Sequence, residues 1–424
     1  MSTATPPRSP RRDDVLDGGG RPPEAHPFWA RLESPLSTYY LLIAVVSSLT
    51  IIGLVIVLSA SSVTQIVQRD SFYSLFVRQA TFAVIGGIGA FVASRIPIAT
   101  WKRLALPIFL GAVGLQLLIF TPLGEEIGGN RNWVSLFGFQ VQPAELAKVA
   151  LVVASALALS AKRHRLREWQ HVIVPAIVPF GAVTIGLVLL GHDLGTALVM
   201  LAMVAAMLWA AGVSWKAFAA AGIAIGALVG GFVATSANRL HRIDTWLNCT
   251  DVHACWQTRH GQFALADGGI LGRGLGASVE KWLWLPEPHN DFIFAIIGEE
   301  LGLWGTLLVL VLYALFALAC YRIVLLSDDQ FVRVATTGVM AWIIVQALIN
   351  IGSVIGLVPV IGVPLPLVSY GGSALVTTLL ALGMVISFAR QEPACRRALA
   401  ARPRGARRLP SWGLRRRPAL RKVT

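Results

Sequence analysis

The chain has 424 residues, of which 55% are hydrophobic and only 14% carry a charge. Soluble domains carry charge on about a quarter of their residues, so this composition excludes an ordinary water-soluble fold and favours a membrane protein. The formal net charge is +14, and much of it lies near the C-terminus. A basic tail can bind nucleic acid, but beside a membrane span it is more simply explained by contact with anionic lipid. No base-reading motif accompanies the tail, so we expect no nucleic-acid partner.

Residues 1–38 precede the main apolar runs and are rich in Pro, Gly, Arg and Asp. This composition predicts a disordered segment and lacks the pattern of a cleavable signal peptide. Apolar runs long enough for a spanning helix then recur along the chain. They cover residues 39–60, 75–94, 104–120, 144–160, 172–190, 194–211, 215–235, 300–321, 332–351 and 366–389. The predicted fold class is therefore all-α, a polytopic membrane domain at 39–390 with about ten transmembrane helices.

The charges on the connecting loops predict the orientation. Loops on one side carry most of the basic residues, whereas the short loops on the other side hold little more than Arg69 and Arg131. Basic loops face the cytoplasm, so the N-terminus and the basic tail at 391–424 are both predicted to be cytoplasmic.

One predicted outer loop, at about 236–299, is much longer than the others. Loops of that length usually carry function. It contains Cys249 and Cys255 on the oxidising side of the membrane. A disulfide between them and two free thiols are both compatible with the spacing.

Asp291 is the first candidate for chemistry, because it ends the long loop just before an apolar run. Partial desolvation there is expected to raise the pKa of its carboxyl toward the range of a general base. The alternative is an aspartate that caps a helix or orders the loop, which the local sequence alone favours. Glu299 and Glu300 follow, and burial of either would require a partner.

A second group of candidates lies around the fourth predicted span. Glu145 and Lys148 are three residues apart, so they share a helix face and form either an internal ion pair or a cation for a lipid diphosphate. Trp133 fits either an interfacial belt or a platform for a sugar ring. Asp193, in the short turn at 191–196, either caps the next helix or pairs with a basic group.

Two glycine-rich stretches have a structural explanation and a functional one. Residues 268–276 superficially match a nucleotide-binding loop, but no βαβ unit surrounds them, so tight turns or close backbone approach are favoured. Residues 362–373 contain Pro and Gly before the last span. They predict either a structural kink or a broken helix that lines a headgroup pocket.

Several motifs in one order carry a specific resemblance. They read Gly-Asn-Arg-Asn-Trp, Gln-Pro-Ala-Glu-Leu-Ala-Lys, Asp-Leu-Gly-Thr-Ala, Pro-His-Asn-Asp-Phe-Ile-Phe and Pro-Leu-Pro-Leu-Val-Ser-Tyr-Gly-Gly-Ser. Together they resemble the SEDS family (shape, elongation, division and sporulation) over residues 39–390, and the division member more than the elongation member.

The resemblance implies a ten-helix peptidoglycan glycosyltransferase that uses lipid II in septal wall synthesis. It implies Asp291 as the essential loop aspartate, and Lys148 and Trp133 as functional residues. Arg131, Asp193, Glu145, His289 and Ser369 fall within matching motifs and are predicted to bind substrate. A class B penicillin-binding transpeptidase and other division proteins are the implied partners, at the septum of a bacterial cytoplasmic membrane.

The sequence departs from the family pattern at two positions. Gln140 stands where an arginine is frequent, and Leu283 stands where an acidic residue is frequent. We therefore expect the diphosphate to be bound differently, through Arg131 or Arg273.

The predicted reaction is a single displacement at an anomeric carbon, with Asp291 as base and with Lys148, arginines or a divalent cation at the diphosphate. Two alternatives stay open. The first is a lipid II flippase, which would need a polar path through the bilayer, and the second is a scaffold that only recruits division proteins.

Overall fold

The computed structural model describes residues 36–67, 71–127, 130–136, 139–162, 179–213, 215–234, 240, 244–247, 255–282 and 284–401. The predicted disordered segment lies almost wholly outside this part, as do most of the basic tail, Cys249 and Leu283. Cys255 is disulfide-bonded. Of the two alternatives left open by the sequence, a disulfide therefore holds for Cys255, and Cys249 as its partner stays a prediction.

The described chain is mainly helical, which confirms the predicted fold class. The bundle helices are α2 (Ser37–Val67), α3 (Ser74–Ala93), α4 (Ile98–Leu117), α5 (Pro143–Ala161), α7 (Val183–Leu190), α8 (Leu194–Ala211), α9 (Trp215–Ala234), α12 (Ile293–Leu326), α13 (Gln330–Val354) and α14 (Gly372–Gln391). Among the described residues, eight helices are long and apolar enough to cross a membrane. The fifth predicted span begins in the undescribed stretch at 163–178, and its described part is a shorter apolar helix, Pro179–Leu190.

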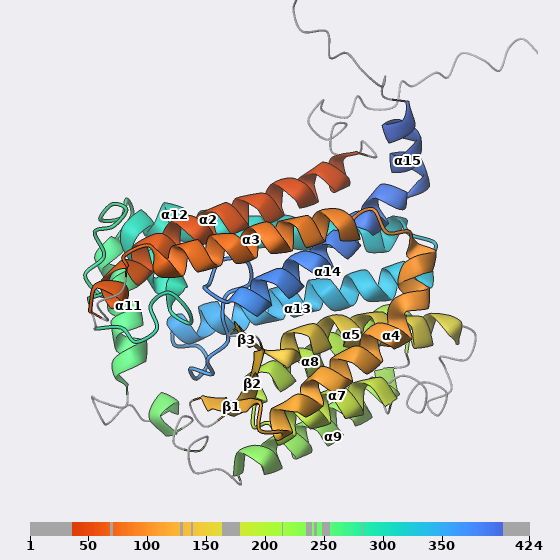
Figure 1. Cartoon of the computed structure of the whole chain (residues 1–424), viewed down its shortest axis with the longest axis horizontal. Coiled ribbons are helices and arrows are strands. Elements are labelled where there is room, and N and C mark those ends of the chain that lie inside the picture. Colours follow the sequence, from red (N-terminus) through yellow and green to blue (C-terminus); the bar gives the residue numbers. More distant parts are fainter. Residues whose placement is uncertain are drawn as a thin grey trace, which may run out of the picture.

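Helix α13 lies at the centre of the bundle (Figure 1). It packs against α5, α8 and α12, while α3 packs against α14 and α2 packs against α12. In α5 and α13, 72% of the most apolar window is buried, but in α3 only 11% is buried. An apolar helix that is exposed in this way must face lipid, so α3 is peripheral and α13 forms the core.

A small antiparallel sheet connects α4 to α5. The all-α prediction placed only a connecting loop between these two spans. After the 3₁₀ turn η1 (Leu118–Phe120) come β1 (Gly124–Ile127), β2 (Asn130–Leu136) and β3 (Phe139–Val141), in the order β1-β2-β3. In β2, Asn132 and Val134 are buried, whereas Arg131, Trp133 and Ser135 are partly exposed. This alternation with a period of two stabilises a strand rather than a helix. We call this end of the bundle the sheet end.

The described part of the predicted long loop lies at the sheet end. It contains α11 (Trp256–Gly268), which packs on α12. A Cβ at Gly268 would overlap the carbonyl group of Gly298, so the glycine permits this close approach. The loop also ends earlier than predicted, because α12 begins at Ile293 rather than at residue 300.

Helix α12 is broken at Gly302, whose φ of 67° and ψ of −160° are not helical. The break frees backbone groups, and the glycine-rich stretch binds them. Arg273 N donates to Glu299 O and Gly274 N donates to Glu300 O, while Leu303 N donates to Gly269 O. Backbone groups released inside an apolar bundle need such partners. The expectation that these glycines serve tight turns and close approach is therefore confirmed.

The last predicted span begins six residues too early. Helix α14 starts at Gly372, and residues 355–371 form a loop at the sheet end. Pro364 and Pro366 disfavour helix, and Leu367 has a φ of 66°, which an α-helix cannot contain. At the opposite end, which we call the tail end, α15 (Pro393–Ala400) follows α14.

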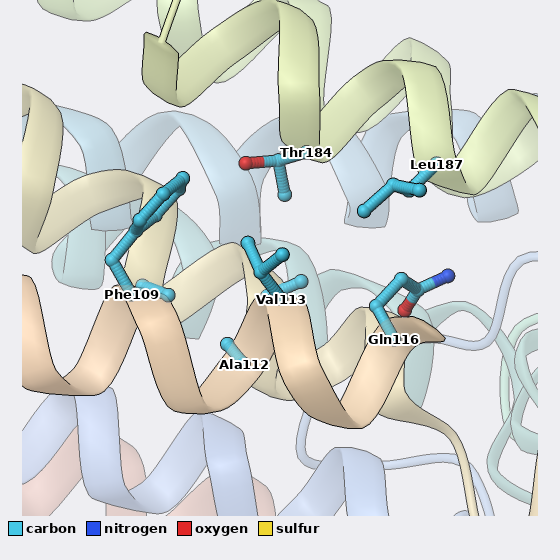
Figure 2. Close-up of a pocket in the computed structure, with 8 residues that line it drawn as sticks. Phe109, Ala112, Val113, Gln116, Thr184 and Leu187 are labelled. Atoms are coloured by element: carbon cyan, nitrogen blue, oxygen red, sulfur yellow. The ribbon is translucent and has the colours of Figure 1, made fainter. Parts of the chain in front are cut away.

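Two spaces among the described residues lie outside the loops of the sheet end. Phe109, Val113 and Gln116 of α4 face Thr184 and Leu187 across a gap that is too small to hold a water molecule (Figure 2). A larger cavity of about 260 Å³ lies at the tail end, where Arg322, Asp328 and Glu392 line it. It is separated from Asp291 by the length of α12, so it is not part of the site described next.

Candidate functional site

Asp291 lies at the sheet end, two residues before α12, and it is half-buried. The loop at 355–371 passes beside its carboxylate. A Cβ at Gly362 would lie 3.5 Å from Oδ2 of Asp291, and Gly362 has a φ of +82°. A glycine is needed there for its backbone conformation, and it also leaves room beside the carboxylate.

The backbone that carries Asp291 is fixed at three consecutive carbonyl groups. The carbonyl of His289 accepts from Tyr370 N at 2.9 Å. The carbonyl of Asn290 accepts from Ser369 Oγ at 2.6 Å, and that of Asp291 accepts from Asn350 Nδ2 at 2.8 Å. Three bonds from two other segments define the position of this short stretch, which is the preorganisation that a catalytic group needs.

Ser369 and His289, both predicted to bind substrate, belong to this framework. Ser369 is 5% exposed, and its hydroxyl also accepts from Leu365 N at 2.8 Å. His289 is 8% exposed, and its ring meets the Tyr370 ring edge-on with centroids 5.6 Å apart. Burial lowers the pKa of His289 from its usual 6.5, and the nearby Glu287 carboxylate opposes that effect. His289 is therefore neutral at pH 7.

Lys148 and Glu145 form the internal ion pair that was one of the two expectations. Lys148 Nζ lies 2.8 Å from Glu145 Oε1, and both side chains are almost fully buried. The ammonium also donates to Gln346 Oε1 at 3.1 Å and lies 4.6 Å from the centroid of the Trp342 ring. All of these contacts are inside the bundle, so the charge of Lys148 is neutralised there.

Asp193 caps a helix, the alternative favoured from the sequence. Its Oδ1 accepts from Thr196 N at 2.9 Å at the start of α8. Its Oδ2 also accepts from Asn132 Nδ2 at 2.9 Å and from Gln142 Nε2 at 3.1 Å. Asp193 therefore joins the sheet and the start of α5 to α8, and it is 7% exposed.

Arg131 and Trp133 lie on β2 and are partly exposed. Arg131 Nη2 donates to Thr121 O at 3.0 Å, so its guanidinium is held against the preceding turn. Trp133 is paired across the sheet with Glu125. Gln140, the first departure from the family pattern, donates to the same Glu125 at 2.8 Å and is exposed.

The two buried glutamates of α12 have partners, as their burial required. Glu300 Oε1 accepts from Lys281 Nζ at 3.1 Å, and Glu299 accepts from Ser278 Oγ at 2.6 Å. Arg273 lies 3.7 Å from Glu299. These contacts tie the loop at 269–282 to the first segment of α12, which begins two residues after Asp291.

The predicted residues thus form groups of different kinds. His289, Asp291 and Ser369 come together directly in one framework. Lys148 and Glu145 reach that framework through Gln346, whose Nε2 donates to Pro364 O at 2.9 Å. Asp193 and Arg131 meet at the turn after α7, because Arg131 N donates to Gly191 O at 3.0 Å.

Sequence reasoning missed Arg78, an exposed cation in the second turn of α3. It is hydrogen-bonded to the Tyr370 side chain, whose pKa is raised by burial and lowered in part by Arg78. Its neighbour Gln79 donates to Ser369 O at 3.1 Å. The available signal was a charge inside a predicted apolar span, which is costly unless it serves a purpose.

It also missed Gln346 and Asn350, which are one turn apart in the span predicted at 332–351. Both are buried, and both donate to loop carbonyls at the sheet end. Two amides on one face of an apolar helix were the signal.

The described residues contain no group of three or more His, Cys, Asp or Glu side chains that could hold a metal ion. A Mg²⁺ ion keeps several waters and is bound through one or two carboxylates plus substrate phosphates, so it does not need such a group. The divalent cation stays a prediction.

The fold and the site show the class of protein. It is a polytopic helical membrane protein that presents an anchored aspartate at one end of its bundle. The chain belongs to the cell cycle protein family of FtsW, RodA and SpoVE, whose profile matches residues 39–393. This confirms the resemblance drawn from the motifs.

Individual relatives agree with the family assignment. The chain is 38% identical over 377 residues to "Probable peptidoglycan glycosyltransferase FtsW" of Mycobacterium tuberculosis, covering 88% of this chain and 72% of the relative. It matches a chain of a solved peptidoglycan synthase complex with a TM-score of 0.68 and 27% identity, covering 83% of this chain and 97% of the other. It also matches the rod shape determining protein RodA of Thermus thermophilus with a TM-score of 0.62 and 27% identity, covering 83% and 96%.

Proposed function

We propose that this protein is a peptidoglycan glycosyltransferase that polymerises lipid II at the outer face of the cytoplasmic membrane during septal wall synthesis. The single observation that carries the site assignment is the framework around Asp291. Three consecutive carbonyls at 289–291 are held by other segments, so the aspartate is presented in a defined place. The reaction class comes from the family, because relatives of this chain are named as peptidoglycan glycosyltransferases.

In the proposed reaction, the Asp291 carboxylate accepts the proton of the acceptor sugar's 4-hydroxyl. The freed oxygen bonds to the anomeric carbon of the donor chain as the bond from that carbon to the undecaprenyl diphosphate breaks. The electron pair of the broken bond leaves with the diphosphate. One displacement inverts the anomeric centre, and a positioned base accelerates such a step by about 10²- to 10⁴-fold.

The leaving diphosphate needs a cation that it can reach. Lys148 was the first expectation, but the residue is 1% exposed and its ammonium is paired with Glu145. Arg78 is exposed and is bonded to Tyr370, whose ring packs on His289 two residues before Asp291. We therefore assign diphosphate contact to Arg78, and we assign to Lys148 the support of the loop through Gln346.

The test is polymerisation of labelled lipid II by the purified protein with a class B penicillin-binding transpeptidase, the partner expected from the family. Asp291→Asn should reduce the rate by about 10²- to 10⁴-fold, because an amide cannot accept the proton. The control is Asp267→Asn, which makes the same chemical change in an α11 residue that is half-exposed and 3.6 Å from Arg273. Full polymerisation by Asp291→Asn would refute the assignment of the base.

Two other functions remain as outcomes of related experiments. A flippase would move lipid II across liposomes without forming polymer, and Asp291→Asn would leave that transport unchanged. A scaffold would support division with Asp291→Asn and fail when residues 402–424 are removed. For the proposed enzyme, Asp291→Asn should prevent polymer formation and should not support division, whereas removal of residues 402–424 should leave division intact.

A further inference from the structure

Asn350 joins two parts of the site that are far apart in sequence. It lies near the end of α13 at the sheet end and is 1% exposed. Its Nδ2 donates to the carbonyl of Asp291 at 2.8 Å and to the carbonyl of Val363 at 2.9 Å. One amide group therefore fixes the distance between the residue that carries the carboxylate and the loop beside it.

The chemistry of both partners determines which end of the amide faces them. Two carbonyl oxygens can only accept, so the NH₂ end of Asn350 must point at them. A carboxylate at this position would place oxygen against oxygen, and an apolar side chain would leave two buried acceptors unsatisfied. Only a side chain with two donors from one atom satisfies both carbonyls here.

The neighbouring turn of α13 repeats the arrangement. Gln346 Nε2 donates to Pro364 O at 2.9 Å, and its Oε1 accepts from Trp342 Nε1 and from Lys148 Nζ. Consecutive carbonyls at 363 and 364 are thus held by consecutive turns of α13, a helix that is largely buried. Gly362, the residue beside the Asp291 carboxylate, directly precedes them.

We propose that Asn350 is a positioning residue of the polymerising site, which holds the Asp291 segment and the 362–364 loop at a fixed separation so that the carboxylate meets the acceptor hydroxyl. This inference rests on the proposed function. It assigns to Asn350 no contact with substrate, because its Nδ2 is used by two backbone groups inside the protein.

The expected signature is a loss of turnover without a loss of substrate binding. Displacing a catalytic group by about 1 Å can cost about 100-fold in rate, so Asn350→Ala should lower kcat by roughly 10- to 100-fold. The KM for lipid II should stay within about twofold, because an unchanged KM with a lower kcat marks an interaction used in the transition state. Asn350→Ser retains one donor and should be intermediate between wild type and Asn350→Ala.

The matched control is Thr337→Val, a buried change on the tail-end half of α13. Its hydroxyl donates only to Arg333 O within its own helix, at 2.9 Å. It should leave kcat and KM unchanged. Binding of a lipid II analogue with a blocked 4-hydroxyl is measured for every variant. The amount bound at saturation corrects each kcat for the fraction of folded protein, and the affinity reports on the substrate site.

Each outcome decides between the inference and its premise. If Asn350→Ala and Asn350→Ser both turn over as wild type while Asp291→Asn is inactive, the positioning role is wrong and the proposed function stands. If Asn350→Ala weakens binding of the blocked analogue as much as it lowers kcat, the role is structural and the inference is wrong. If Asp291→Asn retains full activity, the proposed base fails first.

Discussion

The segment around Asp291 and the pair of Lys148 with Glu145 are both ionisable sites in an apolar bundle, and the protein holds them in opposite ways. At 289–291 the hydrogen bonds that fix the segment fall on three backbone carbonyls. At Lys148 the contacts fall on the charged nitrogen itself, from Glu145, Gln346 and the face of Trp342.

This difference separates two roles that look alike in a sequence. A residue held by its main chain keeps a defined place whatever its side chain does, which suits a group that must meet substrate. A charge held by its head group is neutralised in the fold, and removing one partner leaves the other buried and uncompensated.

The largest expected effect is on the buried pair. Lys148→Met removes the cation and leaves the Glu145 carboxylate buried, which should lower the free energy of unfolding by about 3 to 5 kcal/mol. The double variant Lys148→Met with Glu145→Gln removes both charges and should recover most of that loss. Thermal unfolding in detergent, followed by the fluorescence of the tryptophans, measures both.

The control and the decisive activity measurement use the same proteins. Lys102→Met breaks a half-exposed ion pair with Asp329 at the tail end, 2.7 Å long, and should change stability by less than about 1 kcal/mol. If the double variant folds normally but does not polymerise lipid II, the role of Lys148 is not limited to its ion pair, and the contrast between the two sites is wrong.

The sequence predicted the helices well because an apolar run of the right length has few alternatives in a membrane. It failed where local backbone chemistry overrides hydropathy. The break at Gly302 and the late start of α14 depend on hydrogen bonds from residues 269–274 and on the turn around Leu367. The sheet at 124–141 was missed for the same reason, since its short strands depend on pairing and on contact with Gly191.

The candidate site shows the same limit. Asp291, His289 and Ser369 were found through motifs, and the structure brings them together. The partners Asn350 and Tyr370 were not predicted, because they follow the residues that they contact, Asp291 and His289, by 59 and 81 positions and meet them only through the fold. Spacing could show that Glu145 and Lys148 share a face, but only burial shows that their charges satisfy each other.

A smaller effect is expected at Arg78, the exposed cation on the Asp291 side of the comparison. Arg78→Gln should raise the KM for lipid II about tenfold, which corresponds to the loss of one charge-assisted hydrogen bond of about 1.5 kcal/mol. The rate at saturating lipid II should change less than the KM. Steady-state polymerisation over a range of lipid II concentrations measures both quantities.

Arg95 is the matched control for Arg78, because it is an exposed arginine just beyond the other end of α3, where it lies 4.5 Å from the Phe91 ring. Arg95→Gln should leave the KM unchanged. Equal effects of the two substitutions would mean that any cation on α3 serves the same general attraction to anionic lipid, and Arg78 would lose its assignment.

The smallest expected effect concerns pH and His289, whose pKa is lowered from 6.5 mainly by burial. At His289 the unfolded chain then binds a proton more readily than the folded one. The contribution of this residue to the free energy of unfolding is therefore fully present above about pH 6.5 and is lost as the pH falls below it. His289→Gln keeps a polar side chain without this titration and should flatten the fall in unfolding temperature between about pH 7 and pH 5.5. His192→Asn alters an exposed histidine and should leave the wild-type slope intact. An identical slope in His289→Gln would show that other groups control the acid sensitivity of the site, and that the neutral imidazole packed on Tyr370 contributes nothing to it.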